Sequence, residues 1–156
     1  MKFKIVFVLI SAALLSCNSS IQSPEATSAK KPIEGTWKLL TGTLVEKGDT
    51  VVTDYTKGKS FIKIINGDHF AFLTHDLGKG KSADSMFVAG GGGYSFHDSS
   101  YTEHLEYCND RQWEGNDFPF TITINNDTLI QKGIEKIDSI GVNRLNIEKY
   151  VRLREK

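Results

Sequence analysis

The stretch GGGGYSFHDSSYTEHLEY, residues 90–107, contains two runs of alternating residues with a turn signal between them. The signal is Asp98-Ser99, two residue types that favour tight turns because their short side chains hydrogen-bond to the nearby backbone. A two-residue turn there predicts an antiparallel β-hairpin. The expected cross-strand pairs are Phe96 with Tyr101, Tyr94 with Glu103, Gly92 with Leu105 and Gly90 with Tyr107.

Side chains alternate along a strand, so all of these pairs share one face of the hairpin. That face is aromatic, whereas the other face carries Ser95, Thr102, His104 and Glu106 and is polar. We therefore expect the aromatic face to point inward. Glu103 would then be a carboxylate among aromatic rings, which is costly unless it is hydrogen-bonded or paired. The hydroxyls of Tyr94 and Tyr101 are its nearest expected partners.

The same pattern of short alternating runs and turn signals continues on both sides of the hairpin. Fourteen glycines against three prolines also favour β structure with many turns. The candidate strands are 34–46, 50–55, 60–66, 69–75, 84–96, 101–108, 118–124, 128–135 and 144–154. Runs joined by short hairpins predict an all-β, antiparallel up-and-down meander, and closure into a barrel of about eight strands removes its exposed edges. A barrel of about eight strands can hold one small ligand or be filled by its own side chains.

Two further strands bear on the interior of the barrel. Ile122 alternates with threonines and is expected to face inward. In 60–66, Phe61, Lys63 and Ile65 alternate with Ile62 and Ile64, so either face suits the core. We expect Lys63 to face solvent, because lysine is rarely buried unpaired. An inward Lys63 would be a counter-charge for Glu103 or for a ligand carboxylate.

The sequence Gly35-Thr36-Trp37 opens the first strand and resembles the Gly-x-Trp start of the calycins, which include lipocalins and fatty-acid-binding proteins. The resemblance implies that Trp37 packs at the closed end of the barrel beneath Arg152 of the last strand. The segment 33–156 is similar to the lipocalin-like domains of bacterial lipoproteins. It departs from fatty-acid-binding proteins, whose lipid-binding Arg-x-Tyr order is reversed here in Tyr150-Val151-Arg152. The resemblance to this branch implies no particular ligand.

Residues 1–16 have the pattern of an export signal, with Lys2 and Lys4 before an apolar run over 5–15 that is too short to span a bilayer. The run ends in Leu14-Leu15-Ser16-Cys17, which resembles the lipobox of bacterial lipoproteins. The resemblance implies cleavage before Cys17 and its lipidation. An ordinary secretory signal with an incidental cysteine is the alternative. Residues 17–32 are expected to form a flexible tether, because they contain little that can be buried.

Charge and cysteine content limit the classes of function. With 19 basic and 19 acidic side chains the formal charge is zero, so no nucleic acid is expected as a partner. No cofactor is predicted. His104, Glu106 and Cys108 alternate at a spacing that can ligate a metal, but their face is expected outside and a fourth ligand is missing, so no metal site is predicted. Cys108 is expected to be a half-buried packing residue.

These observations favour a protein that is anchored by lipid in the bacterial envelope, in the outer membrane facing the periplasm, and binds a small apolar or amphipathic molecule. The expected pocket residues are Phe70, Phe72, Tyr94, Phe96, Tyr101, Glu103, Leu105, Tyr107 and Ile122. An interaction module with a filled barrel and an envelope protein as partner is the alternative. An enzyme with Glu103 as acid or base is disfavoured, because no second catalytic group is evident.

Overall fold

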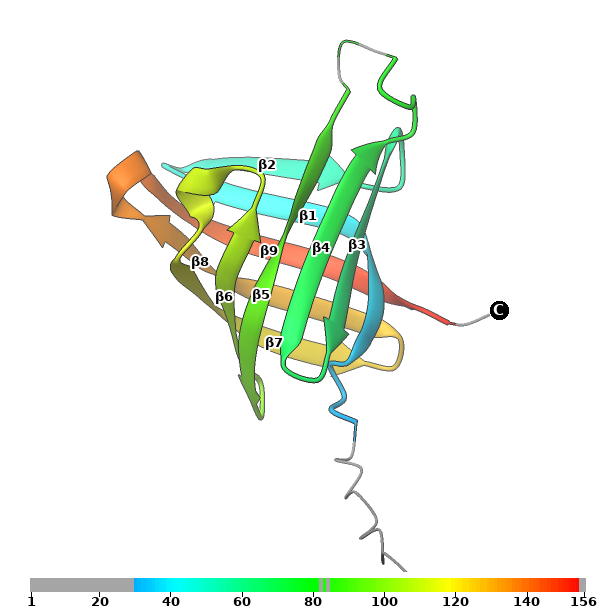
Figure 1. Cartoon of the computed structure of the whole chain (residues 1–156), viewed down its shortest axis with the longest axis vertical. Coiled ribbons are helices and arrows are strands. Elements are labelled where there is room, and N and C mark those ends of the chain that lie inside the picture. The colour runs from blue at the N-terminus through cyan, green and yellow to red at the C-terminus, as the bar shows by residue number, and fades with distance from the viewer. Residues whose placement is uncertain (1–29, 82, 84, 155–156) are drawn as a thin grey trace, which may run out of the picture.

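The computed structural model describes residues 30–81, 83 and 85–154. It contains nine strands and two single-turn 3-10 helices (Figure 1). The strands are β1 (Gly35–Glu46), β2 (Asp49–Asp54), β3 (Lys59–Asn66), β4 (His69–Asp76), β5 (Phe87–His97), β6 (Ser100–Cys108), β7 (Asn116–Asn125), β8 (Thr128–Ile137) and β9 (Val142–Leu153); the 3-10 helices are η1 (Arg111–Trp113) and η2 (Asp138–Ile140). Each of the nine predicted strands forms, within a few residues of its expected ends.

The strands make a closed antiparallel barrel. Strands β3 to β9 pair in chain order, and β1 completes the ring by pairing with β3 on one side and β9 on the other. Strand β2 lies outside this ring and pairs only with the second half of β1, from Thr41 to Glu46. The prediction of an up-and-down barrel of about eight strands is therefore confirmed, with one extra strand.

The tight hairpins place polar residues where the backbone turns left-handed. The first residues of the β5–β6 and β7–β8 turns, Asp98 and Asn126, have φ angles of 55° and 52°. Asn and Asp tolerate this region better than most residues, because their short side chains hydrogen-bond locally. The turn signal at Asp98-Ser99 thus connects His97 to Ser100 as the sequence predicted.

One end of the barrel, which we call the closed end, is sealed around Trp37. This side chain is fully buried, and its Nε1 donates a hydrogen bond of 2.8 Å to the Ile33 carbonyl. The Arg152 guanidinium lies 4.0 Å from the centre of the indole ring. It also donates to the carbonyls of Glu34 and Pro32 at 2.6 and 2.7 Å. The last strand therefore fixes the segment before β1.

Residues 31–34 form a strap across the closed end. Lys31 Nζ donates to the Gly67 carbonyl at 2.7 Å and lies 4.8 Å from the centre of the Tyr94 ring. Ile33, within the strap, is fully buried. Lys31 and Pro32, which the sequence prediction assigned to the tether, thus contact the barrel. The predicted signal segment and Cys17 lie outside the described residues.

A β-bulge changes the predicted register of the decisive hairpin. The pairs from the turn to Gly92–Leu105 form as expected, but Gly91 then pairs with Tyr107 and Gly90 with Cys108, so Glu106 is the extra residue of β6. One extra residue moves every later side chain to the opposite face. Tyr107, expected in the pocket, is therefore 66% exposed on the outer wall. Cys108 turns inward instead.

The glycine run of β5 permits this bulge. A Cβ atom on Gly92 would lie 2.0 Å from the His104 carbonyl oxygen, whereas one on Gly93 would have no neighbour nearer than Glu106 Oε1, at 3.5 Å. The two strands therefore approach more closely at Gly92 than any side chain allows.

The described residues include no helix long and apolar enough to cross a membrane.

Gly92→Ala should lower the free energy of unfolding by about 1–3 kcal/mol, because the backbone of β6 has to move. Gly93→Ala is the matched control, and it should leave stability unchanged or raise it by about 0.4–1 kcal/mol through reduced freedom of the unfolded chain. Urea unfolding of both variants checks this. Equal losses in the two variants would show that no close approach exists at Gly92.

Candidate functional site

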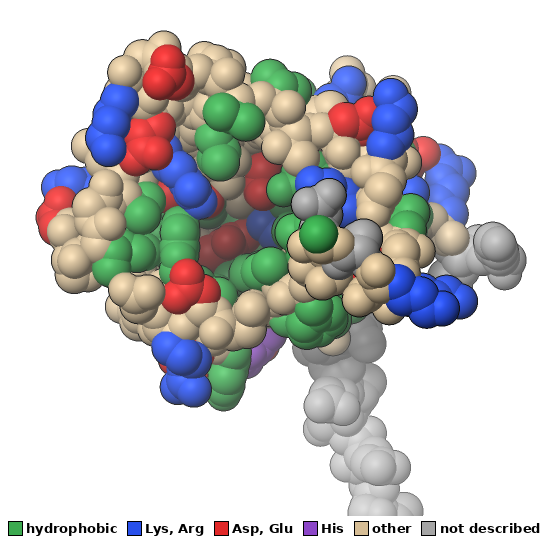
Figure 2. All heavy atoms as spheres, turned by 90° about the horizontal axis from the view of Figure 1, so that it is seen from above, with side chains coloured by type: hydrophobic (Ala, Val, Ile, Leu, Met, Phe, Trp, Pro, Cys, Tyr) green, Lys and Arg blue, Asp and Glu red, His purple; other side chains and the backbone are tan. Residues whose placement is uncertain are grey.

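The end of the barrel opposite Trp37 contains a cavity of about 320 Å³. Figure 2 looks into this open end and shows hydrophobic side chains around a hollow with acidic and basic atoms at its bottom. Aromatic and aliphatic groups form most of the wall. They are Phe61, Phe72, Val88, Leu105, Trp113, Phe118 and Phe120, and the thiol of Cys108 lies among them.

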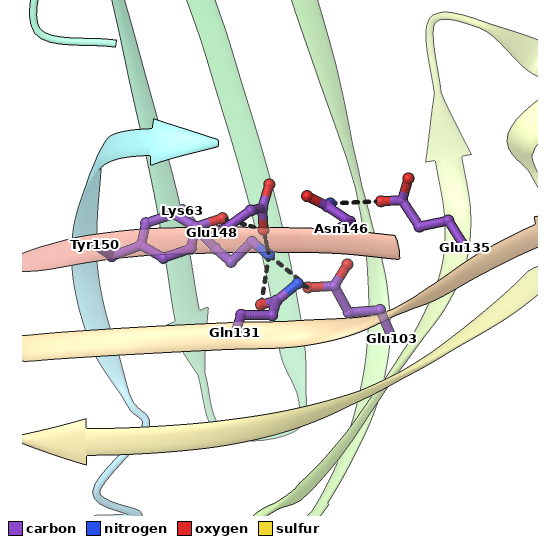
Figure 3. Close-up of polar contacts among 7 residues, drawn as sticks. All are labelled: Lys63, Glu103, Gln131, Glu135, Asn146, Glu148 and Tyr150. Carbon is purple, nitrogen blue, oxygen red and sulfur yellow. Dashed lines mark hydrogen bonds and ion pairs between the residues drawn. The ribbon is translucent and has the colours of Figure 1, made fainter. Parts of the chain in front are cut away.

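The floor of the cavity is built around Lys63, which β3 points inward (Figure 3). Its Nζ lies 2.6 Å from Glu103 Oε1, 3.0 Å from Gln131 Oε1 and 3.7 Å from Glu148 Oε2. The side chains of Lys63 and Glu103 are only 4% and 9% exposed. The expectation that Lys63 faces solvent is therefore wrong, and the reason is the counter-charge that β6 supplies.

The two members of this ion pair influence each other's protonation. Burial alone would lower the pKa of Lys63, but the charges of Glu103 and Glu148 outweigh it and hold this pKa above its ordinary value. Burial raises the pKa of Glu103, while the charge of Lys63 opposes that shift. Lys63 is thus protonated at neutral pH, and it stabilises the carboxylate beside it.

A second ion pair stands nearer the mouth. Glu135 of β8 accepts hydrogen bonds from Arg144 Nε at 2.6 Å and from Asn146 Nδ2 at 2.7 Å. The Arg144 guanidinium also lies 5.0 Å from the centre of the Trp113 ring. These contacts fix the first part of β9 against η1 and β8.

Two buried tyrosines of the core contact the carboxylates of the floor. Tyr150 donates to Glu148 Oε2 at 2.7 Å. Tyr101 is fully buried next to Glu103, but among the described residues its hydroxyl reaches no partner in hydrogen-bonding geometry. Burial first, and then the nearby carboxylate charges, raise the pKa of both phenols, so both are neutral. The expected proximity of Tyr101 to Glu103 is present, since the hydroxyl and the carboxylate each shift the pKa of the other.

The structure distributes the predicted pocket residues over three places. Phe72, Glu103 and Leu105 line the cavity. Phe70, Tyr94, Tyr101 and Ile122 are buried in the core, with the half-buried Phe96 packed against them. Tyr107 lies outside, as described above. Whether any of them contacts a ligand stays a prediction.

Several cavity residues were not expected from the sequence. Gln131, Asn146 and Glu148 are inward polar side chains on β8 and β9, and Trp113 comes from η1. Residues 146, 148, 150 and 152 alternate along β9 and therefore share one face. Because the expected contact of Arg152 with Trp37 points that face inward, the sequence could have indicated that Asn146 and Glu148 also face inward. Trp113 had no such signal.

His104 takes no part in the cavity. Its Nδ1 lies 2.8 Å from Asp117 Oδ1 on the outer wall. No group of three or more histidine, cysteine or acidic side chains in the described part of the chain is arranged to hold a metal ion.

The chain matches no protein-family model, and a search of curated proteins finds no relative. The closed barrel is consistent with a calycin but is not specific to one.

Lys63→Met should lower the free energy of unfolding by about 3–5 kcal/mol at neutral pH, because Glu103 is left buried without a counter-charge. The double variant Lys63→Met, Glu103→Gln should recover most of this loss. Urea unfolding measures both.

The defect of Lys63→Met should also shrink as the pH falls. Without the lysine, the pKa of Glu103 in the folded state rises further above its value in the unfolded chain. The charged carboxylate then destabilises the folded state at neutral pH, and this loss disappears as the pH falls and the folded state takes up the proton. A defect that is constant from neutral to acidic pH would contradict the role assigned to Glu103.

Proposed function

We propose that this protein binds a small, largely apolar molecule in the open end of its barrel. The observation that carries the proposal is the cavity of about 320 Å³, which lies at the lower end of the range of small-molecule sites, about 300–1,000 Å³. A filled barrel would have favoured the alternative of a pure interaction module. The cavity therefore supports a binding protein.

The chemistry of the lining also supports this proposal. Ligand sites are mostly apolar, with a few polar groups that fix orientation. Here a wall of aromatic and aliphatic side chains, among them Phe61 and Phe120, surrounds a floor that carries Glu103 and Glu148. The wall would bury the body of the ligand, and the floor would select its polar end.

The β-bulge provides a matched pair of variants to test the proposal. Cys108→Trp should fill the cavity, because Cys108 lines it, whereas Tyr107→Trp places the same ring on the outer wall one residue earlier. N-phenyl-1-naphthylamine, an apolar dye that brightens on leaving water, should bind the native chain and Tyr107→Trp but lose binding in Cys108→Trp. Equal dye fluorescence in all three proteins would contradict a ligand site in the barrel, provided that circular dichroism shows all three folded.

The native ligand can be sought without knowing its identity. Native mass spectrometry of the protein purified from its own membranes should show a co-purifying small molecule. A bound protein instead would favour the interaction module, which the exposed Val51, Val52, Phe87 and Tyr107 would then serve.

We further propose that the chain is held at the periplasmic face of the outer membrane by lipid on Cys17, on the strength of the lipobox-like Leu14-Leu15-Ser16-Cys17. Because each buried CH₂ contributes about 0.8 kcal/mol, several acyl chains anchor a protein firmly. Cys17→Ser should move the protein from the membrane fraction to the soluble fraction, and Cys108→Ser should not. Membrane retention of Cys17→Ser would contradict the anchor.

A further inference from the structure

The charged side chains that line the cavity do not balance. Glu103, Asp110, Glu135 and Glu148 are acidic, whereas only Lys63 and Arg144 are basic. Four acids against two bases leave an excess of two negative charges around a space of about 320 Å³. The excess matters most at the floor, where Lys63 alone faces both Glu103 and Glu148.

Both cations already have partners. Lys63 Nζ donates hydrogen bonds to Glu103 and Gln131 at 2.6 and 3.0 Å, and it forms a longer ion pair of 3.7 Å with Glu148. Arg144 Nε donates to Glu135, and the guanidinium lies 5.0 Å from the centre of the Trp113 ring. Each cation is therefore already opposed by at least one carboxylate, which weakens its attraction for the carboxylate of a fatty acid.

The unused hydrogen-bonding capacity of the floor belongs mainly to acceptors. Among the described residues, no donor bonds to Glu148 Oε1 or Asn146 Oδ1, although Glu148 Oε2 and Asn146 Nδ2 are both engaged. Both side chains face the cavity from β9. A ligand that supplies several N–H donors and positive charge would satisfy this floor.

We propose that the ligand is a small organic cation, namely a protonated amine on an aromatic or branched aliphatic body. This inference rests on the proposed binding function and narrows it. The ammonium group is placed against Glu148 and Asn146, with the charge of Glu103 close by. The apolar body lies between Phe61, Phe72 and Phe118, whose ring faces also attract cations. The cavity volume of about 320 Å³ limits the body to a small molecule.

The test compares three matched probes, which are 2-phenylethylamine, 2-phenylethanol and phenylacetate. Binding is followed by NMR titration of the isotope-labelled protein, with the indole resonance of Trp113 as the reporter in the cavity and that of Trp37 as the reference at the closed end. The amine should bind about tenfold or more tightly than the alcohol, the ratio expected when a charged hydrogen bond replaces a neutral one. The carboxylate should bind least.

Glu148→Gln should reduce the amine affinity to about that of the alcohol and leave the alcohol unchanged. Glu34→Gln removes the same charge at the closed end and should keep the preference for the amine. If Glu148→Gln does not fold, which a urea transition without cooperativity would show, Glu103→Gln is the second floor variant. It too should reduce the preference for the amine over the alcohol.

The outcomes separate this inference from the proposed function. If alcohol and amine bind equally, or if the carboxylate binds best, the cavity is a binding site but the cationic ligand is wrong. If no probe shifts the Trp113 resonance, both proposals fail. An amine preference that survives Glu148→Gln and Glu103→Gln also overturns the inference.

Discussion

A lysine inside a β-barrel has to be neutralised from within, and the interior of this protein is organised around that constraint. Lys63 lies on β3, while Glu103, Gln131 and Glu148 come from β6, β8 and β9. Breaking such a pair leaves an uncompensated buried charge, which costs far more than the intact pair contributes. The interaction therefore acts mainly as a requirement for register, because a slip of one residue in any of these strands would turn its side chain outward.

The interior is divided along the barrel axis into two parts. At the closed end Trp37 is fully buried, and between it and the floor carboxylates Tyr101 and Tyr150 are fully buried as well. At the open end, aromatic side chains stand around the cavity without filling it. The ionic floor separates these two regions. The packed closed end, with the strap of residues 31–34 across it, holds the floor residues in place. Such ordering before binding reduces the entropy that is lost when a ligand binds.

The fold was predictable from sequence because its determinants are local. Alternation with period two and the turn signals at Asp98-Ser99 and Asn126-Asp127 are visible in a window of ten residues. The site was only partly predictable, because its determinants are not local. Lys63 is separated from Glu103 by 40 residues, so the sequence named Glu103 as the counter-charge of an inward Lys63 but could not decide that the lysine faces inward. The glycines at 90–93 are compatible with a bulge, but they do not reveal that Glu106 of the partner strand is the extra residue.

The pairing of β1 with β9 has a consequence for how the protein is made. The ring closes between β1 and β9, so the barrel cannot form before the whole of β9 is available. The C-terminal strand also carries Asn146, Glu148, Tyr150 and Arg152, which serve the floor and the strap. Contacts this distant along the chain form slowly, because the entropy of the long loop is lost before they form. Until β9 pairs with β1, Lys63 and the aromatic wall stay open to water, and a chaperone that shields unfolded hydrophobic segments would find its substrate in that interval.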